Sequence, residues 1–462
     1  MSGGFERTIM IKITLEKMVE ISKGSLTHDF DMTPTNIKID SRHVSADDYF
    51  MPILGEIHDG HKFIVSAFEN GVQIAFCEKA YYYSHQEVLM DYPLILVDNT
   101  TKVLHRISKY ILKETGVRTI GITGSVGKTS TKEFIYHALK GSFNVHKNKG
   151  NFNNHIGMPL TIFDLDYDHD IAILEMGMNH FKEIELLVET ARPEVAVITN
   201  IGTSHIGILG SRENIFQAKM EITSYLRQED TLVINVDDDF LPSIKKADFN
   251  VLRIHEDLKA EHIRMKDDGA YTYDLNGQKV SLDVLGKHNI SNSMLAIGVA
   301  MTLGVDLEKA CNGIADYHDS NKRLEILKGR KGSTVINDCY NASQESMMAA
   351  IEVLENYKQK KIAILGDVLE LGDYSRVSHE SVGSFIVEHP VEHLITFGSE
   401  SKHIIEKAKV LGYTGDVNHY ENIDDLYEAL EPLIDDSVIL VKGSFGMGMS
   451  RIIEYLGGRH DG

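Results

Sequence analysis

Short apolar runs alternate with helical patterns through the middle of the chain. The runs lie at 120–123, 171–174, 195–200 and 232–235. Between them, apolar residues recur at the three- and four-residue spacing of helices. This alternation favours a parallel sheet with helices on both faces. Polar, turn-rich sequence at 267–277 then leads to a helical pattern at 289–303, which we expect to close this unit.

The two ends of the chain carry related patterns. Up to about residue 112, apolar runs at 71–77 and 94–97 mix with a turn cluster at 57–60, which indicates a small α/β unit. After Arg323, a helical pattern covers 344–357 within a second alternating series. The strand-like runs of that series lie at 333–338, 361–365, 394–397 and 438–441. We predict an α/β protein of three domains, with boundaries at 1–112, 113–322 and 323–462.

Composition narrows the possible functions. A length of 462 residues suggests about three domains of ~150 residues. A net charge of −21 argues against a general nucleic-acid or anionic-membrane surface. The three cysteines are odd in number and widely spaced, which fits a reducing cytoplasm better than a disulfide framework. Because neither a signal-peptide core nor an apolar run of ~18 residues is present, we expect a soluble, cytoplasmic protein.

The segment 118–139 has the features of a nucleotide-phosphate loop. Its sequence, RTIGITGSVGKTSTKEFIYHAL, passes from an apolar strand through glycines into a helical pattern. Gly124 and Gly127 let backbone N–H groups turn inward, and the positive end of the helix would face the phosphates. Lys128 would contact the β- and γ-phosphates, and Thr129 would hold Mg²⁺. The segment therefore predicts a nucleotide-binding site.

Three further residues lie where ligands collect in open α/β sheets, near the carboxyl ends of strands. Glu175 ends the strand-like IAILE and could reach Mg²⁺, although such a glutamate as often only starts a helix. His205 follows another strand end, where a lone histidine is more often structural. Lys219 lies on a helical pattern whose charges are normally solvated. The pattern alone assigns none of them a function.

The motifs as a set resemble the Mur ligase family, ATP-dependent enzymes that join amino acids or peptides to the UDP-muramoyl precursor of peptidoglycan. GDVLELGDYS within 364–379 favours the type that adds D-alanyl-D-alanine. The resemblance covers nearly the whole chain in the family's order. Its segments are 40–64, 121–133, 148–161, 174–187, 198–222, 286–296, 336–351, 364–379 and 440–453.

The resemblance implies a fold and a reaction. The domains would be a small α/β UDP-binding domain, a central P-loop-type ATPase domain with a parallel sheet, and a C-terminal Rossmann-like ligase domain. ATP would phosphorylate the terminal carboxylate of UDP-N-acetylmuramoyl-tripeptide, and the amine of D-alanyl-D-alanine would then displace phosphate from the acyl phosphate. Mg²⁺ and Lys128 would offset the repulsion between the two anions. We expect a monomer without nucleic-acid partners or membrane insertion.

The resemblance also assigns residues to the site. ATP would contact Gly124, Ser125, Gly127, Lys128, Thr129, Ser130, Asn292, Arg323, Asp338, Tyr340 and Asn341. The metal residues would be Thr129, Glu175, His205 and Lys219, the last as a carbamate formed with CO₂, and Lys128, Glu175, His205 and Lys219 would be catalytic. Substrate would contact Ser41 and Arg42 through UDP, Asn151, Asn153 and Asn154 through the peptide, and Lys442 and Ser444 near the reacting carboxylate and the dipeptide.

Several positions depart from the family's pattern. Ile122 stands where a strict phosphate loop has its first glycine, and Asn337 and Ser343-Gln344 replace an acid and an Asn-Pro pair. Leu54 and Phe445 each replace a cation, which indicates either an altered substrate contact or tolerated drift.

Other functions stay open. The main alternative is another Mur-type ligase, amino-acid-adding or with a different acceptor, although the Asp-Asn-Pro-Arg motif of one such class is missing. Folylpolyglutamate and cyanophycin synthetases share the core but lack the UDP segment, and a regulatory nucleotide-binding protein would not need the complete residue set. The third residue of the tripeptide, diaminopimelate or lysine, also stays open.

Overall fold

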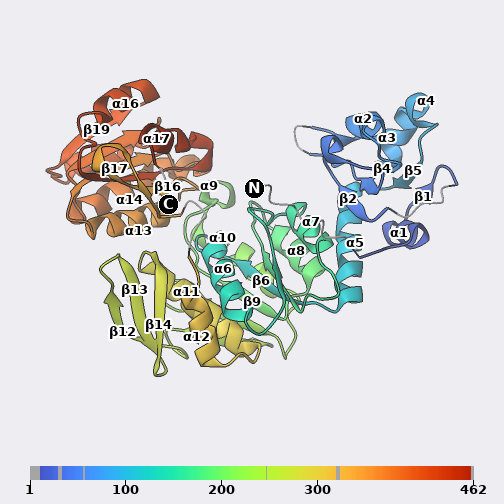
Figure 1. Cartoon of the computed structure of the whole chain (residues 1–462), viewed down its shortest axis with the longest axis horizontal. Helices are drawn as coiled ribbons and strands as arrows, with labels where there is room; N and C mark the ends of the chain where they lie inside the picture. Colours follow the sequence, from blue (N-terminus) through green and yellow to red (C-terminus); the bar gives the residue numbers. More distant parts are fainter. Residues whose placement is uncertain (1–10, 30–33, 56–57, 246, 319–322, 459–462) are drawn as a thin grey trace.

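The computed structural model describes residues 11–29, 34–55, 58–245, 247–318 and 323–458. Residue 57 of the predicted turn cluster lies outside these ranges. The described strands form four sheets that follow one another along the chain. Figure 1 shows the first unit in blue at one end, the central unit in green, a small yellow sheet beside it, and the last unit in orange and red.

The first unit is a five-stranded sheet in the order β1-β5-β4-β3-β2, in which β1 is antiparallel to β5 and the other pairs are parallel. The strands are β1 (Ser25–Leu26), β2 (Asn36–Lys38), β3 (Asp48–Phe50), β4 (Ile74–Glu78) and β5 (Leu94–Val97). The helices are α1 (Leu15–Ser22), α2 (Ile64–Glu69), α3 (Lys79–Ser84) and α4 (Gln86–Leu89). This confirms the predicted small α/β unit.

Helix α5 (Thr100–Thr115) joins the first unit to the central one. The Asn99 side chain accepts a hydrogen bond from the Lys102 N–H at its start, and Gly116 ends it at a φ of 67°. The helix contacts α1 on one side and α7 and α8 of the central unit on the other. The first unit is therefore attached to the central unit through this helix.

The central unit is a six-stranded parallel sheet in the order β11-β10-β9-β6-β8-β7; the parallel sheet was predicted with its four inner strands, and the edge strands β7 and β11 were not. The strands are β6 (Arg118–Thr123), β7 (Val145–Lys147), β8 (Ile171–Glu175), β9 (Val195–Ile198), β10 (Thr231–Asn235) and β11 (Asn250–Ile254). The helices are α6 (Lys128–Leu139), α7 (Gly157–Phe163), α8 (Glu183–Ala191), α9 (Ile206–Leu209), α10 (Arg212–Met220), α11 (His288–Thr302) and α12 (Leu307–Ala315).

Both faces of the central sheet are buried. In β8, Ile173 packs with Phe134 of α6 in one core, whereas Leu174 packs with Leu187 of α8 in the other. A strand covered on both faces reads as a continuous apolar run, which is why the sequence pattern located these strands.

The stretch predicted as polar turns at 267–277 is instead part of a three-stranded antiparallel sheet, so that prediction was wrong. Its strands are β12 (Ala260–Met265), β13 (Ala270–Leu275) and β14 (Gln278–Leu285). One face packs on the central unit, where the Tyr273 hydroxyl hydrogen-bonds to Ser293 at 2.8 Å. Asn276 and Gly277, both at positive φ, form the tight turn of a hairpin. Polar residues on the open face concealed the strand pattern.

The last unit is a six-stranded sheet in the order β15-β16-β20-β17-β18-β19, parallel except for β15. The strands are β15 (Glu325–Lys328), β16 (Thr334–Asp338), β17 (Lys360–Gly366), β18 (His393–Phe397), β19 (Asp416–Tyr420) and β20 (Ser437–Lys442). The helices are α13 (Gln344–Glu355), α14 (Ser375–Glu388), α15 (Lys402–Val410), α16 (Ile423–Leu430) and α17 (Ser450–Tyr455). The two edge strands, β15 and β19, were not predicted because they are short and largely polar.

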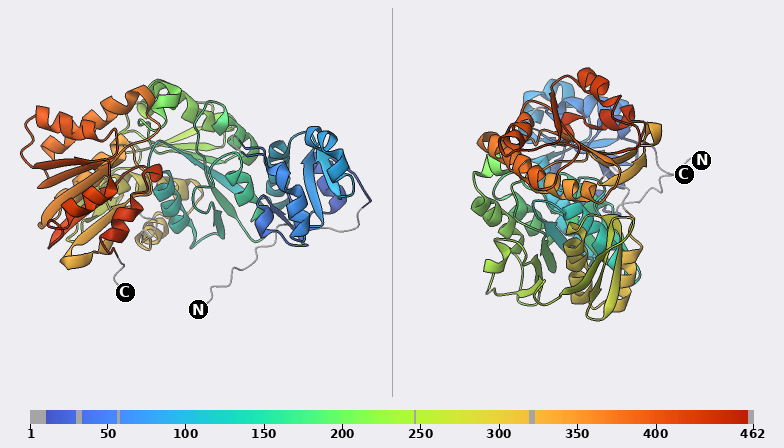
Figure 2. Two further views of the ribbon diagram at one scale, coloured as in Figure 1. Left: turned by 90° about the horizontal axis from the view of Figure 1, so that it is seen from above. Right: turned by 90° about the vertical axis from the view of Figure 1, so that its left-hand side faces the viewer.

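The last unit contacts the central unit at the loop that carries His205. A Cβ atom at Gly207 would lie 2.4 Å from the carbonyl carbon of Leu371, so the two backbones touch at this point. The Glu345 carboxylate accepts a 2.7 Å hydrogen bond from the Thr203 N–H. Figure 2 shows the resulting arc, with the central unit between the first and the last. None of the helices in the described residues has the length and apolar character to cross a bilayer.

Candidate active site

The predicted phosphate loop connects β6 to α6. Gly124 adopts a φ of 150°, and a Cβ atom there would lie 1.8 Å from the Thr199 hydroxyl. Gly127 caps α6 at a φ of 84°. Both glycines are therefore required by the backbone. Ile122 is a fully buried strand residue. The turn into the loop is made by Gly124, two residues after the position where the strict motif has its first glycine.

The loop is held by the end of β9. Its Ser125 N–H donates to the Asn200 carbonyl at 3.1 Å, and its Ser125 hydroxyl accepts from the Gly202 N–H at 2.9 Å. The Asn200 side chain accepts from the Val126 N–H at 3.0 Å and donates to the Val126 carbonyl at 3.0 Å. A loop fixed on both sides presents its remaining N–H groups in a defined direction.

Lys128 lies inside this loop. Its amine donates to the carbonyls of Gly124 at 2.7 Å and Ser125 at 3.4 Å. Burial lowers the pKa of Lys128, and the nearby Glu175 carboxylate opposes that shift. The amine and the positive end of α6 share one small volume, an arrangement suited to a phosphate group. Ser130 follows in the first turn of α6 and is buried.

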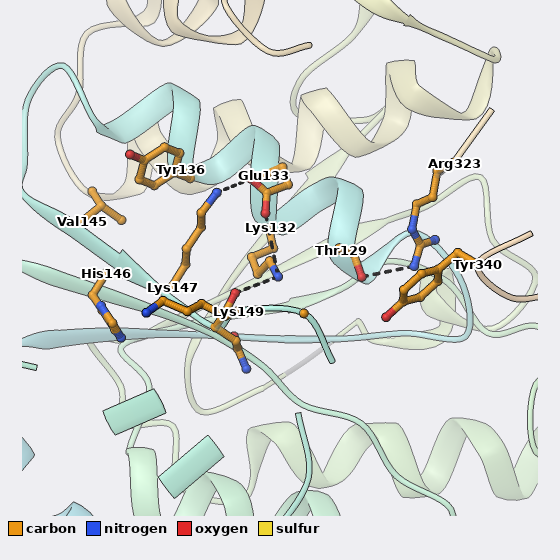
Figure 3. A pocket seen from close by; sticks show the side chains of 12 residues that line it. Thr129, Lys132, Glu133, Tyr136, Val145, His146, Lys147, Lys149, Arg323 and Tyr340 are labelled. Atoms are coloured by element: carbon orange, nitrogen blue, oxygen red, sulfur yellow. Dashed lines mark hydrogen bonds and ion pairs between the residues drawn. The ribbon is translucent and has the colours of Figure 1, made fainter. Parts of the chain in front are cut away.

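Glu175 and Thr129, predicted as metal residues, are brought together. The Thr129 hydroxyl donates to Oε2 of Glu175 at 3.0 Å. Asn153, predicted to read substrate, donates to Oε1 of Glu175 at 2.9 Å. Arg323 donates to the Thr129 hydroxyl at 3.2 Å, and its guanidinium carbon lies 4.5 Å from the centre of the Tyr340 ring. Figure 3 shows Arg323 above Tyr340 and directed to Thr129.

Lys219 and His205 lie on the other side of Lys128. Burial, with a further contribution from Lys128, lowers the pKa of Lys219 well below its ordinary value. In the part of the chain that the structure describes, its amine has no hydrogen-bond or ion-pair partner. Burial lowers the pKa of His205 to about 4, helped by Lys128 and Lys219. The His205 Nδ1 atom lies 3.1 Å from the Glu370 carboxylate of the last unit.

The predicted nucleotide residues come from two units. Asn292 of α11 accepts from the Thr131 hydroxyl at 3.3 Å, and a Cβ atom at Gly127 would lie 2.7 Å from its side-chain oxygen. In the last unit, the Lys442 amine donates to Asp338 at 2.6 Å and to the Asn341 carbonyl at 3.1 Å. Asp338 and Lys442 are therefore a buried pair at the ends of β16 and β20, and the exposed Asn341 lies beside them.

The remaining predicted substrate residues are spread out. Ser41 and Arg42 lie in the first unit, where Arg42 binds Asp40 through two hydrogen bonds of 2.9 and 2.7 Å. The Asn154 side chain accepts from the Gly157 N–H at 2.8 Å at the start of α7, and Asn151 is exposed. The Ser444 hydroxyl accepts from the Leu369 N–H at 2.9 Å. Neither Ser41 nor Arg42 contacts the Lys128 region within the described residues.

Apart from Ile122, the departures from the family pattern lie away from the phosphate loop. Leu54 is 56% exposed and Phe445 is 76% exposed. Asn337 donates to Glu325 at 2.7 Å, and Ser343 caps α13 together with Ser346. These contacts leave the arrangement around Lys128 intact.

Two residues that the sequence interpretation did not select complete the site. Lys132 donates to the Asn148 carbonyl at 3.1 Å, and the Asn148 side chain accepts from the Glu175 N–H at 2.7 Å. The position of Lys132, one helical turn after Lys128, is the feature of the sequence that could have identified it as a site residue. Beside α6 lies a cavity of about 430 Å³, whose lining includes Thr129, Lys132, Tyr136, Lys147, Arg323 and Tyr340 (Figure 3).

The residues present suit Mg²⁺ bound through a nucleotide. Among the described residues, no three His, Cys, Asp or Glu side chains converge as a metal site. Thr129 and Glu175 offer a hydroxyl and one carboxylate 3.0 Å apart. Mg²⁺ is commonly held by one or two carboxylates together with phosphate oxygens and water. A dedicated protein cage is therefore not needed here.

Comparison with known proteins agrees with the fold. Three family models match: "Mur ligase family, catalytic domain" over 33–110, "Mur ligase middle domain" over 122–300, and "Mur ligase, glutamate ligase domain" over 322–445. The UDP-N-acetylmuramoyl-tripeptide--D-alanyl-D-alanine ligase of Bacillus subtilis is 36% identical, covering 97% of this chain and 99% of that protein.

Two solved structures are also similar. MurF from Acinetobacter baumannii has a TM-score of 0.90 at 27% identity, covering 97% of this chain and 99% of that one. MurF ligase from Thermotoga maritima in complex with ADP has a TM-score of 0.80 at 26% identity, covering 91% and 96%.

Proposed function

This chain belongs to the Mur ligase family, and we propose that it joins D-alanyl-D-alanine to UDP-N-acetylmuramoyl-tripeptide with ATP. The observation that carries the proposal is the arrangement of Lys128, Thr129 and Glu175 around the predicted phosphate loop, in a chain that matches a ligase of this name over nearly its full length. The amino-acid-adding alternative is not favoured, because that relative adds the dipeptide.

A carboxylate is a poor electrophile, so the reaction needs an activated acyl group. Transfer of the ATP γ-phosphoryl group to the tripeptide carboxylate forms an acyl phosphate and ADP. The dipeptide amine then attacks the carbonyl carbon, the bond to phosphate breaks, and the amine loses a proton. Lys128 and the N-terminus of α6 would hold the phosphates in line for the first step.

Thr129 and Glu175 would hold Mg²⁺, which would neutralise the charge that develops on the phosphates. Lys219 would react with CO₂ as a neutral amine, forming an N–C bond and releasing a proton. The resulting carbamate is an anion beside the Lys128 region, where His205 also lies. The burial of the Lys219 side chain, the lack of a partner for it among the described residues, and its lowered pKa support this role.

The last unit would complete the nucleotide site. Arg323 can pair with a phosphate through its planar donors, and Tyr340, Asp338 and Asn341 would lie beside the nucleoside. Asn292 would contact the nucleotide from the α11 side. Lys442 and Ser444 would face the reacting carboxylate and the dipeptide once the last unit closes over the site. Closure would exclude water that otherwise hydrolyses the acyl phosphate.

The first unit would bind the UDP part of the substrate through Ser41 and Arg42, and Asn151, Asn153 and Asn154 would read the peptide. We assign these roles to domains bounded at 1–112, 113–322 and 323–462. We expect a monomer that acts in the cytoplasm, with neither nucleic acid nor membrane as partner. The hydrogen bond from Asn153 to Glu175 supports a direct link between the residues that would read the peptide and the carboxylate that would hold the metal.

The test is product formation by the purified protein with ATP, Mg²⁺, UDP-N-acetylmuramoyl-tripeptide and D-alanyl-D-alanine. We expect phosphate release and a pentapeptide mass that require both substrates, with diaminopimelate and lysine tripeptides compared. A product formed with a single amino acid but not with the dipeptide would contradict the proposal and favour the amino-acid-adding alternative.

A further inference from the structure

Lys132 is a buried cation that the proposed reaction does not use. It lies one helical turn after Lys128 on α6, and its side chain is only 2% exposed. Removing an ammonium group from water is costly unless hydrogen bonds and opposite charges compensate. The partners of Lys132 therefore indicate why a charge is kept at this position.

Two carboxylates lie at equal distance from the Lys132 amine. Glu133 Oε1 and Glu175 Oε2 are each 3.8 Å away. Glu133 has a second cationic partner, because Lys147 also forms an ion pair with it. In the described ranges, Lys132 is the one lysine or arginine within 4.0 Å of the Glu175 carboxylate. Lys132 thus supplies the nearest compensating charge for the buried Glu175 among the described residues, beside the hydrogen bonds from Thr129 and Asn153.

Lys132 also holds the backbone that surrounds Glu175. Its amine donates to the Asn148 carbonyl at 3.1 Å. The Asn148 side chain accepts from the Glu175 N–H at 2.7 Å and donates to the Phe152 carbonyl at 2.6 Å. Asn153, the next residue, donates to the Glu175 carboxylate at 2.9 Å. Residues 148–153 and Glu175 therefore form one hydrogen-bonded unit, and Lys132 attaches this unit to α6.

We propose that Lys132 is a positioning residue, which orients the Glu175 carboxylate beside Thr129 and couples it to the peptide-reading segment 148–154. This inference rests on the proposed function, in which Glu175 holds Mg²⁺. Lys132 touches no reacting atom and acts through Glu175 and Asn148. Groups that orient a metal ligand in this way typically change metal affinity 10- to 100-fold when they are removed.

The test measures metal binding separately from turnover. Mn²⁺ is titrated into the full-length protein with a non-hydrolysable ATP analogue, and free Mn²⁺ is followed by electron paramagnetic resonance. We expect K132M to weaken Mn²⁺ binding at least about 10-fold, while affinity for the analogue without metal stays unchanged. K132R keeps the charge and should recover part of the loss. K140M, a more exposed lysine at the end of the same helix, should bind Mn²⁺ like the wild type.

Other outcomes would overturn the inference. Wild-type Mn²⁺ affinity in K132M would do so, and so would an equal loss of metal-free nucleotide binding, which a merely structural role predicts. If K132M does not fold, K132Q serves instead, because it removes the charge while its amide can still donate to the Asn148 carbonyl; wild-type Mn²⁺ affinity in K132Q would refute the role assigned to the charge beside Glu175. A wild-type protein that makes no pentapeptide, with Mn²⁺ binding still lost in K132M, would contradict only the proposed function.

Discussion

The Thr129 hydroxyl donates a 3.0 Å hydrogen bond to the Glu175 carboxylate. Thr129 lies in the first turn of α6, and Glu175 is the last residue of β8. Because β6 and β8 are neighbours in the parallel sheet, the loop after one strand meets the end of the other. This pairing of Thr129 with Glu175 defines where a phosphate-bound cation would be held.

Substitutions at Thr129 should show how much the hydroxyl group contributes to activity. We expect Thr129→Ala to lower kcat about 100-fold, the scale for loss of one oriented polar group in a water-excluded site. Thr129→Ser keeps the hydroxyl and should retain most of the activity. Steady-state phosphate release checks both variants. Equal losses in the two variants would show that the methyl group, and not the hydroxyl, matters.

Lys219 should reduce stability at neutral pH. The folded protein favours the neutral amine, whereas the unfolded chain protonates near 10.5. The unfolded state therefore binds more protons, and the stability of the wild type should rise with pH toward 10.5. We expect Lys219→Met to raise Tm at neutral pH in CO₂-depleted buffer and to abolish turnover, with the Tm difference shrinking at high pH. Calorimetry across pH measures this; a lower Tm for Lys219→Met would contradict it.

A carbamate on Lys219 should be observable directly. With ¹³C-labelled bicarbonate, the wild-type protein should show a carbamate ¹³C resonance that Lys219→Met lacks. The Lys140→Met variant, which changes a lysine at the end of α6, is the matched control and should keep the resonance. A resonance that survives in Lys219→Met would assign the modification to another amine.

The buried pair of Asp338 and Lys442 should behave as a unit. The amine and carboxylate lie 2.6 Å apart with side chains 9% exposed or less. Removing one partner leaves a buried charge, so Lys442→Met should destabilise by about 3–5 kcal/mol. The double variant with Asp338→Asn should recover much of that loss. Urea unfolding measures the cycle, and Glu380→Gln at the exposed pair with Arg376 should cost less than about 1 kcal/mol.

Phe445 tests whether a departure from the family pattern has a function. Its side chain is 76% exposed, and exposed substitutions usually change free energies by about 0.5 kcal/mol or less. If the departure has no function, Phe445→Arg should leave the KM values for ATP, tripeptide and dipeptide within about twofold of those of the wild type. A selective fall in the dipeptide or tripeptide KM would instead identify position 445 as a specificity determinant.

Much of the fold was predictable because its strands are buried on both faces. β6, β8, β9 and β10 read as continuous apolar runs, and the same holds for β16, β17, β18 and β20. The missed strands include the edge strands β7, β11, β15 and β19 and the sheet of β12, β13 and β14. Their exposed sides carry polar residues, so half of each pattern resembles loop sequence. A strand that is buried on one face gives a weaker apolar pattern in the sequence than a strand that is buried on both.

The sequence by itself determined the phosphate loop, the order of the parallel strands along the chain, and membership of a ligase family. Local sequence decides the first two features, since glycine placement and apolar periodicity act over a few residues, and the family follows from the resemblance of motifs along the whole chain. Tertiary structure alone decided that Thr129 meets Glu175, that the Lys219 side chain is buried with no partner among the described residues, and that Lys132 joins α6 to the segment after β7. Such relationships depend on which strands become neighbours and on how far water is excluded, and both are set by packing between residues distant in the chain.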